Sequence, residues 1–461
     1  MNTKALRQKI LDLAIHGKLV PQDPNDEPAS VLLERIKAEK ERLIKEGKIK
    51  RTKRSKAACD KPHYPYELPK GWCWTTLGDI AESNIGLTYK PSDICLDGIP
   101  VYRSNNIKNG HIDLSDVVRV NTKILEKQFL NEGDLLICAR NGSRRLVGKN
   151  AIISQLDEPA AFGAFMAVCR SSYNPWICLV LNTTYFDRYL DDSNSATINQ
   201  VTQSMLLAFP VPFPPKNEQD RIINEVAQLE SVVANINDNI DCLNTVIKQT
   251  KSKILNLAIH GKLVPQAPTD EPAYELLKRI NPKAEITCDN PHYRNLPKGW
   301  AVCRLEDIVE IFDNLRKPIN SNERNSRIAN KHKDELYPYY GATGQVGLID
   351  AYLIDGTYLL LGEDGAPFLD KSAVKAYPIE GKCWVNNHAH ILKPLCDFDY
   401  LMFYLNQVDY KDYVNGSTRL KLTQSDMRSI LVLLPPIAEQ KRISAKIRAL
   451  FDLLDSIVYH L

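Results

Sequence analysis

The chain has 461 residues, of which 44% are hydrophobic and 25% charged, and its formal net charge is +3. One hydrophobic core rarely serves a chain of this length, so we expect two or more domains. The composition excludes a mainly disordered chain, and the small net charge means that any surface for nucleic acid must be local.

Membrane insertion and export are not expected from the sequence. It holds no run of 18 apolar residues, and its first nine residues are polar, without an apolar export core. The 11 cysteines show no CxxC spacing, which is typical of reduced thiols. We therefore expect a cytoplasmic protein without disulfides or membrane contact.

An internal repeat organises the chain. The ten residues Leu13–Gln22 recur unchanged as Leu257–Gln266, and Leu68–Trp72 recurs as Leu296–Trp300. A third pair of matching segments closes each half: Thr202-Gln203-Ser204, Pro214-Pro215 and Glu218-Gln219 match Thr423-Gln424-Ser425, Pro435-Pro436 and Glu439-Gln440. The sequence therefore predicts a duplicated scaffold.

The segments between these shared borders, roughly 73–200 and 301–420, have little sequence in common. A shared frame with two different inserts indicates that the frame has one role, and that the inserts carry two distinct specificities.

A long amphipathic helix is predicted in the middle of the chain, over 218–260. Its apolar residues alternate at spacings of four and three, interrupted only at Thr250: Ile222, Val226, Leu229, Val233, Ile236, Ile240, Leu243, Ile247, Ile254 and Leu257. This heptad pattern is typical of a coiled coil, and such a helix would be about 64 Å long.

The two ends of the chain are predicted to supply the partner of this helix. The segment 439–461 repeats the pattern of its first half, and 1–17 repeats that of its second half. We expect the two terminal helices to form one long helix, split between Met1 and Leu461, that runs antiparallel to 218–260. The alternatives are that each terminal helix packs on its own neighbouring domain, or that the heptads mediate a homodimer.

A helical arm is predicted after the first repeat, over 26–50, with Asp26 as a possible cap and Pro28 in the first turn. The stretch 37–56 is rich in Lys and Arg. It is interpreted either as a solvated helix face or as a segment that contacts phosphates.

Both inserts predict short strands followed by loops rich in Arg, Lys, Asn, Ser and Gly. These side chains can pair with base edges or with phosphates, although turns in any protein have a similar composition. The candidate DNA contacts in the first insert are Lys90, Arg103, Asn105, Asn106, Arg140, Asn141, Ser143, Arg144 and Arg145. In the second insert they are Arg316, Lys317, Thr343, Gln345, Lys371, Asn386, Asn387, His388, Arg419 and Lys421.

No catalytic or metal-binding motif is found in the sequence. Asn174-Pro175-Trp176 lacks the second proline of an adenine methyltransferase loop, and the spacing from Gly142 to Lys149 differs from that of a phosphate-binding loop. His388 and His390 alternate on a predicted strand without further ligands, which favours a structural role. The sequence therefore predicts neither a catalytic site, nor a cofactor site, nor a metal site.

These motifs resemble the specificity subunits of Type I restriction–modification systems. The resemblance rests on the repeated arm Leu13–Gln22, the Leu-Pro-Lys-Gly-Trp entries, the Pro-Pro-x-x-Glu-Gln exits into long helices, Tyr339–Gly344 and Asn386–His390. It covers essentially the whole chain.

The resemblance implies an α+β chain with two α/β-type target recognition domains, separated by an antiparallel coiled coil of two long helices in a cyclic, pseudo-two-fold arrangement. The implied division is a conserved region 1–61, a recognition domain 62–213, a central conserved region 214–290, a second recognition domain 291–434 and a distal helix 435–461.

The resemblance also implies the partners: double-stranded DNA, two methyltransferase subunits and restriction subunits. S-adenosylmethionine would bind the methyltransferase, which methylates adenine N6, and ATP and Mg would bind the restriction subunit. This chain would hold no cofactor and would not be an enzyme.

A helical spacer between two different inserts predicts an asymmetric, bipartite DNA target, with half-sites about one helical turn (roughly 34 Å) apart. The alternatives are a structural coiled-coil adaptor without DNA specificity, and an enzyme whose active site is not recognisable in the sequence.

Overall fold

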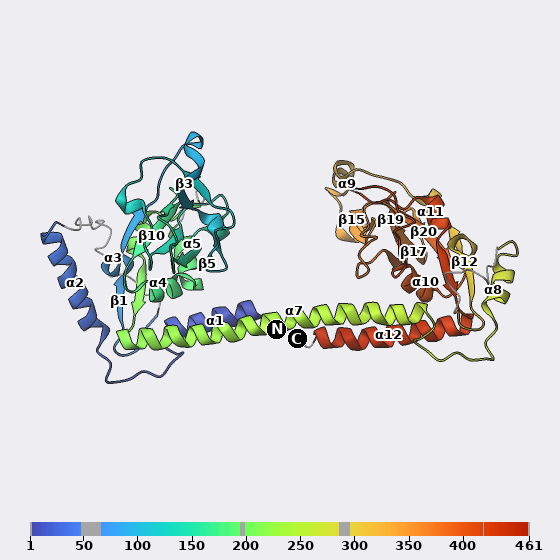
Figure 1. Ribbon diagram of the computed structural model, residues 1–461, viewed down its shortest axis with the longest axis horizontal. Coiled ribbons are helices and arrows are strands. Elements are labelled where there is room, and N and C mark those ends of the chain that lie inside the picture. Colours follow the sequence, from blue (N-terminus) through green and yellow to red (C-terminus); the bar gives the residue numbers. More distant parts are fainter. Residues whose placement is uncertain (1, 48–65, 194–198, 285–295, 418, 460–461) are drawn as a thin grey trace. The chain divides into compact units, whose positions relative to one another are not determined.

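The computed structural model describes residues 2–47, 66–193, 199–284, 296–417 and 419–459. The chain divides into two compact units, residues 1–238 and 239–461, each of which is described by itself (Figure 1). The finer division into five segments at 61, 213, 290 and 434 stays a prediction.

The first unit contains six helices within the described residues and the first part of a seventh. They are α1 (Thr3–Ile15), α2 (Ala29–Lys45), α3 (Leu77–Ile80), α4 (Asn174–Leu181), α5 (Thr184–Ser193), α6 (Gln203–Ala208) and the start of α7 (Lys216–Ile259). Its strands are β1 (Cys73–Thr76), β2 (Glu82–Ile85), β3 (Ile94–Tyr102), β4 (Ile107–Lys108), β5 (His111–Ile112), β6 (Val118–Val120), β7 (Leu135–Cys138), β8 (Asn150–Ile152), β9 (Ala161–Phe162), β10 (Met166–Arg170) and β11 (Pro210–Phe213). We call residues 73–213 the first head.

The second unit holds the remainder of α7 and a similar series of elements. Its helices are α8 (Ala273–Ile280), α9 (Ser321–Ile328), α10 (Phe398–Leu405), α11 (Gln424–Arg428) and α12 (Ile437–Tyr459). Its strands are β12 (Ala301–Arg304), β13 (Val309–Ile311), β14 (Tyr337–Tyr340), β15 (Gln345–Ile349), β16 (Ile354–Asp355), β17 (Tyr358–Gly362), β18 (Ala376–Ile379), β19 (Lys382–Val385), β20 (Ala389–Pro394) and β21 (Leu431–Leu434). We call residues 301–434 the second head.

The two heads share two sheets and most of a third. An antiparallel four-stranded sheet has the order β2-β10-β7-β8 in the first head and β13-β20-β17-β18 in the second. A two-stranded ribbon joins the ends of each head, β1 with β11 and β12 with β21. A further sheet in each head contains one parallel pair, β3 with β9 and β14 with β19. Two dissimilar sequences therefore form equivalent frameworks.

The helix predicted over 218–260 is α7, which is continuous through 44 residues. In the first unit α1 lies along α7 and runs antiparallel to it, because Thr3 contacts Asn237 and Arg7 contacts Glu230 (Figure 1). In the second unit α12 lies along the later half of α7, where Lys251 Nζ is 2.6 Å from Asp455 Oδ1. Each half of α7 thus pairs with one terminal helix, and the expected antiparallel helix pairs are confirmed.

The heptad positions are most buried near the starts of α7 and α12, and they are more exposed near the chain ends. Ile222, Ile443 and Ile447 are fully buried, whereas Leu6 is 38% and Ile457 is 41% exposed. The expected apolar seam therefore does not extend to these two residues, where α1 begins and α12 ends. Met1 and Leu461, where the split was predicted, lie outside the described residues. The terminal helices also pack on their own heads, as one alternative proposed: Ile10 and Leu11 of α1 belong to the core of the first unit.

The predicted arm is α2, which is shorter than expected. It begins after Pro28, and Asp26 does not cap it, because the Asp26 carboxylate instead binds Arg221 and Asn217 of α7. The C-terminal part of the basic stretch, 48–56, lies outside the described residues.

Each unit contains the same junction between its helix pair and its head. Trp72 Nε1 donates to Glu218 Oε2 at 2.9 Å, and Trp300 Nε1 donates to Glu439 Oε2 at 3.1 Å. Arg221 binds Asp26 and Arg442 binds Asp270, both at 2.6 Å. Repeated sequence therefore produces repeated contacts.

The second residue after each repeated helix end, Gly17 or Gly261, must be glycine. Gly17 and Gly261 have φ of +62° and +66°, and a Cβ at either position would lie 2.5 Å from the Cγ of Pro69 or Pro297. Both the left-handed backbone and the close proline ring exclude larger side chains at this turn.

Candidate nucleic-acid interface

Two loops that the sequence predicted as DNA contacts lie together in the first head. One follows β3 and carries Arg103 and Ser104, and the other follows β7 and carries Arg140 and Asn141. Asn141 Nδ2 donates to Ser104 Oγ at 3.2 Å, which joins the loops. They converge because the sheets place the ends of β3 and β7 close together.

The turn between β9 and β10 also lies at this edge, and the sequence analysis missed it. The backbone N–H groups of Ala139 and Arg140 both donate to Phe165 O, at 2.9 and 3.0 Å. The Phe165 side chain is 61% exposed, and the Arg140 guanidinium lies 5.5 Å from the centre of its ring. An aromatic residue in a turn has no distinctive sequence signal, so no pattern could have identified it.

The cations of these loops differ in their surroundings. Arg103 is half-buried, and within the described part of the chain its buried Nε makes no hydrogen bond. Arg140 and Arg145 are exposed, and no ion pair of either is found among the described residues. Arg144 instead binds Asp191 at 2.6 Å. Arg103, Arg140 and Arg145 therefore retain donors for a ligand.

Asn106 is only 1% exposed. Its Oδ1 accepts from the Arg103 backbone N–H, and its Nδ2 donates to Asp113 O and Asp116 O. Its amide therefore stabilises the turn after β3 and is not available to DNA. The remaining first-head candidates, Lys90, Asn105 and Ser143, are exposed.

In the second head, the corresponding loops follow β14, β17 and β19. Asn386 N donates to Tyr340 O at 3.1 Å, and Glu363 N donates to His388 O at 2.8 Å. These bonds place the turn after β14, the loop after β17 and the turn between β19 and β20 at one edge of the head.

Two acidic residues at this edge of the second head hold most of its cations. Asp364 Oδ1 is 2.6 Å from Arg419 Nε, and Glu363 Oε1 is 3.3 Å from Lys421 Nζ. Arg316 also binds Glu363, while His388 Nδ1 is 3.4 Å from Asp364 Oδ2. Three of the predicted DNA contacts therefore form ion pairs with carboxylates here, and a fourth, His388, lies beside Asp364 without a hydrogen bond to it, which the sequence did not reveal.

A buried histidine, His390, forms hydrogen bonds near this loop. His390 is 0% exposed; its Nδ1 is 2.7 Å from Asp313 Oδ2 and its Nε2 is 3.0 Å from Leu422 O. Burial raises the pKa of Asp313, but hydrogen bonds from His390 and the Ile391 backbone outweigh it and leave that pKa below its ordinary value. His390 therefore makes structural hydrogen bonds, the role that the sequence favoured because no further ligand motif accompanies the two histidines.

The other second-head candidates divide by exposure. Asn386 is 8% exposed, and its Oδ1 accepts from the His388 backbone N–H, so its role is in the turn. Lys317, Thr343, Gln345, Lys371 and Asn387 are exposed.

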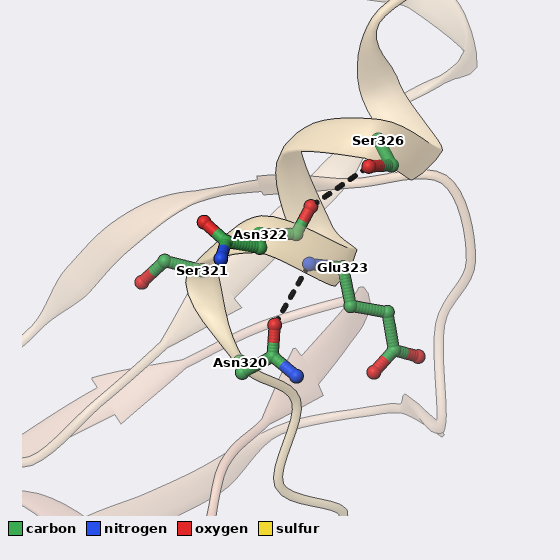
Figure 2. Close-up of a pocket in the computed structure, with 5 residues that line it drawn as sticks. All are labelled: Asn320, Ser321, Asn322, Glu323 and Ser326. Carbon is green, nitrogen blue, oxygen red and sulfur yellow. Dashed lines mark hydrogen bonds between the residues drawn. The ribbon is translucent and has the colours of Figure 1, made fainter.

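A shallow polar hollow lies at the start of α9, lined by Asn320, Ser321, Asn322, Glu323 and Ser326 (Figure 2). Asn320 Oδ1 caps the helix by accepting from Glu323 N at 2.8 Å. The hollow contains no pairing of a nucleophile with a base. Among the described residues, no group of three or more His, Cys, Asp and Glu side chains is arranged to hold a metal ion. The helices in that part of the chain include none long and apolar enough to cross a membrane.

The fold and its loops define a class of protein: two mixed α/β heads with one topology and different loop chemistry, each carried on a repeated helical scaffold. Residues 69–244 and 297–458 match the family model described as Type I restriction modification DNA specificity domain. The chain therefore belongs to this family.

Individual relatives agree with this assignment. The chain is 33% identical to the specificity subunit of the Escherichia coli Type I restriction enzyme EcoAI, over 67% of this chain and 63% of that one, so the match spans less than two thirds of that relative. It is 27% identical to the EcoEI specificity subunit, also from Escherichia coli, over 98% of this chain and 90% of that one. A solved structure from a study of complex assembly in a type I R-M system covers 86% of this chain with a TM-score of 0.54 and 16% identity, which shows a shared fold.

Proposed function

We propose that the chain is the DNA-specificity subunit of a Type I restriction–modification system, and that each head recognises one half of an asymmetric bipartite target. The observation that carries the proposal is the pair of equivalent loop edges with different side chains. The first edge presents Arg103 and Arg140, whereas the second presents Glu363 and Asp364 with their bound cations. Different donors and acceptors on one framework would bind different base sequences.

Catalysis is proposed to belong to the partners rather than to this chain. Two methyltransferase subunits would bind S-adenosylmethionine and methylate adenine N6, and restriction subunits would use ATP and Mg. The relatives named above are specificity subunits, which supports this division.

The exposure and ion pairs of the nineteen predicted DNA contacts divide them into three groups. We propose direct DNA contact for the exposed or half-buried residues without an ion pair in the described chain: Lys90, Arg103, Asn105, Arg140, Asn141, Ser143, Arg145, Lys317, Thr343, Gln345, Lys371 and Asn387. Arg419, Lys421 and His388 would first exchange a carboxylate for DNA. Asn106, Asn386, Arg144 and Arg316 are proposed to position loops.

The length of α7 is proposed to set the spacer between the two half-sites. α7 is one continuous helix that begins in the first unit and ends in the second, and its 44 residues correspond to about 66 Å. Insertion of four or seven residues near Leu243 is expected to lengthen the preferred spacer, because each added residue extends the helix by about 1.5 Å. Footprints of the assembled complex on targets with graded spacers measure the effect, and an unchanged spacer preference would contradict it.

The function is tested by mapping methylated adenines in host DNA with and without this gene. We expect one bipartite, asymmetric motif to lose its methylation when the gene is absent. A structural adaptor would instead leave the purified complex without sequence preference and without salt-dependent DNA affinity. An enzyme with an unrecognised site would show turnover by the isolated chain with DNA and cofactor.

A further inference from the structure

The edges of the two heads are equivalent residue by residue in their backbone hydrogen bonds. In the first head the N–H groups of Ala139 and Arg140 donate to Phe165 O. In the second, the N–H groups of Glu363 and Asp364 donate to His388 O. Arg140 therefore corresponds to Asp364, and Phe165 corresponds to His388.

Neighbouring contacts support the same alignment. Val201 N donates to Ala139 O, and Leu422 N donates to Glu363 O, both at 2.7 Å. Arg140 forms an isolated β-bridge with Gln200, as Asp364 does with Lys421. The alignment thus rests on three chain segments in each head and does not depend on sequence similarity.

At both edges the residue just after a strand (β7 or β17) contacts, through its side chain, a residue in the turn between two later strands (β9 and β10, or β19 and β20). In the first head the pair is a guanidinium and an aromatic ring, with Arg140 5.5 Å from the centre of the Phe165 ring. In the second it is a carboxylate and an imidazole, with Asp364 3.4 Å from His388. The framework is common, and only the chemistry of the pair changes.

The exposure of Phe165 is not explained by folding. Its ring is 61% exposed, although the strands on either side of it bury Phe162 and Met166. An exposed aromatic ring beside an arginine without an ion pair in the described chain suits a base edge in the major groove, where Arg binds guanine and an apolar side chain contacts the thymine methyl group.

We propose that Phe165 is a specificity-determining residue of the first head, and that it recognises the C5-methyl group of a thymine next to the base bound by Arg140. This inference rests on the proposed function. In the second head His388 takes the same position, so it offers an imidazole instead of an apolar surface to the other half-site.

The test replaces each thymine of the first half-site by uracil, which removes only the C5-methyl group, and measures binding of the full chain assembled with its methyltransferase partners. We expect one thymine at which uracil weakens wild-type binding about four-fold, the equivalent of about one buried methyl or methylene group. Phe165→Ala should lose this discrimination and bind both duplexes equally, whereas Phe165→Leu should retain part of it.

Leu96→Ala is the matched control, because Leu96 is an apolar side chain of the same head that is 91% exposed and lies near the start of β3, whereas Arg103 follows the end of that strand. It should leave discrimination unchanged. The proposal is overturned if the first half-site contains no thymine, if wild type does not distinguish uracil at any position, or if Phe165→Ala still distinguishes it. Loss of all sequence preference by the wild-type complex would instead overturn the proposed function itself.

Discussion

A comparison of the two heads shows that the same backbone arrangement can present different side chains at its edge. Both place a loop, a strand end and a turn between two strands at one edge through the same hydrogen bonds. In the first head the edge has arginines without ion pairs in the described chain and an exposed aromatic ring, whereas in the second two carboxylates hold Arg316, Arg419 and Lys421. The framework fixes where contacts are made, and the side chains fix which contacts are possible.

The two units can first be compared at their junctions, where we expect tryptophan substitutions to cause large and equal losses of stability. Trp72→Ala and Trp300→Ala should each lower the free energy of unfolding by about 3–5 kcal/mol, because each removes a buried ring and leaves a cavity. Urea denaturation of the full chain measures this loss. Leu96→Ala, at an exposed position, should change stability by less than about 0.5 kcal/mol. A large loss for one tryptophan and a small loss for the other would show that the junctions are not equivalent.

The contributions of the two edges to DNA binding can be compared by replacing one cation in each with alanine. Arg140→Ala should weaken DNA binding by about 1–3 kcal/mol, because no ion pair holds its guanidinium in the described chain. Lys421→Ala should cost less, because Lys421 must leave Glu363 before it can contact DNA. Titrations of the assembled complex at several salt concentrations measure both, and a greater loss for Lys421→Ala would contradict the proposed order.

The smallest expected effect is a pH dependence at the junctions. Burial raises the pKa of Glu218 and of Glu439 above the ordinary value, and a hydrogen bond from Trp72 or Trp300 only partly opposes it. A carboxyl group with a raised pKa in the folded state stabilises the fold at low pH, and this contribution is lost as the pH rises above about 4.5.

Glu218→Gln should therefore reduce the decrease in stability above that pH, because glutamine keeps an acceptor for Trp72 without a buried charge. Thermal unfolding between about pH 4 and about pH 8, where a carboxyl group with a raised pKa titrates, measures how stability changes with pH. A steeper decrease in the variant would contradict the assignment, and Glu439→Gln serves as the matched variant of the second unit.

The scaffold could be predicted because its signals are local. The heptads from Ile222 onward determined α7 and its partners, since a 3.5-residue repeat has few alternative structures. The exact repeats predicted a duplicated scaffold, although not that Asp26 binds Arg221 instead of capping α2. Charge pairs between distant segments leave no pattern in the sequence.

The candidate interface was less predictable, because its geometry arises from contacts far apart in the chain. Polar loop residues were identified from composition, but composition does not distinguish Asn105, which is exposed, from Asn106, whose amide holds its own turn. Similarly, the acidic pair Glu363 and Asp364 becomes important only when the strands bring Arg419 and Lys421 beside it.

The backbone bonds to Phe165 O and His388 O have a consequence for the origin of new targets. The edge of each head is held by main-chain N–H and C=O groups, which every amino acid other than proline supplies. The side chains of Phe165 and His388 therefore take no part in these backbone hydrogen bonds. Selection could exchange them one at a time, and a descendant could acquire a different recognition sequence while its stability stayed the same.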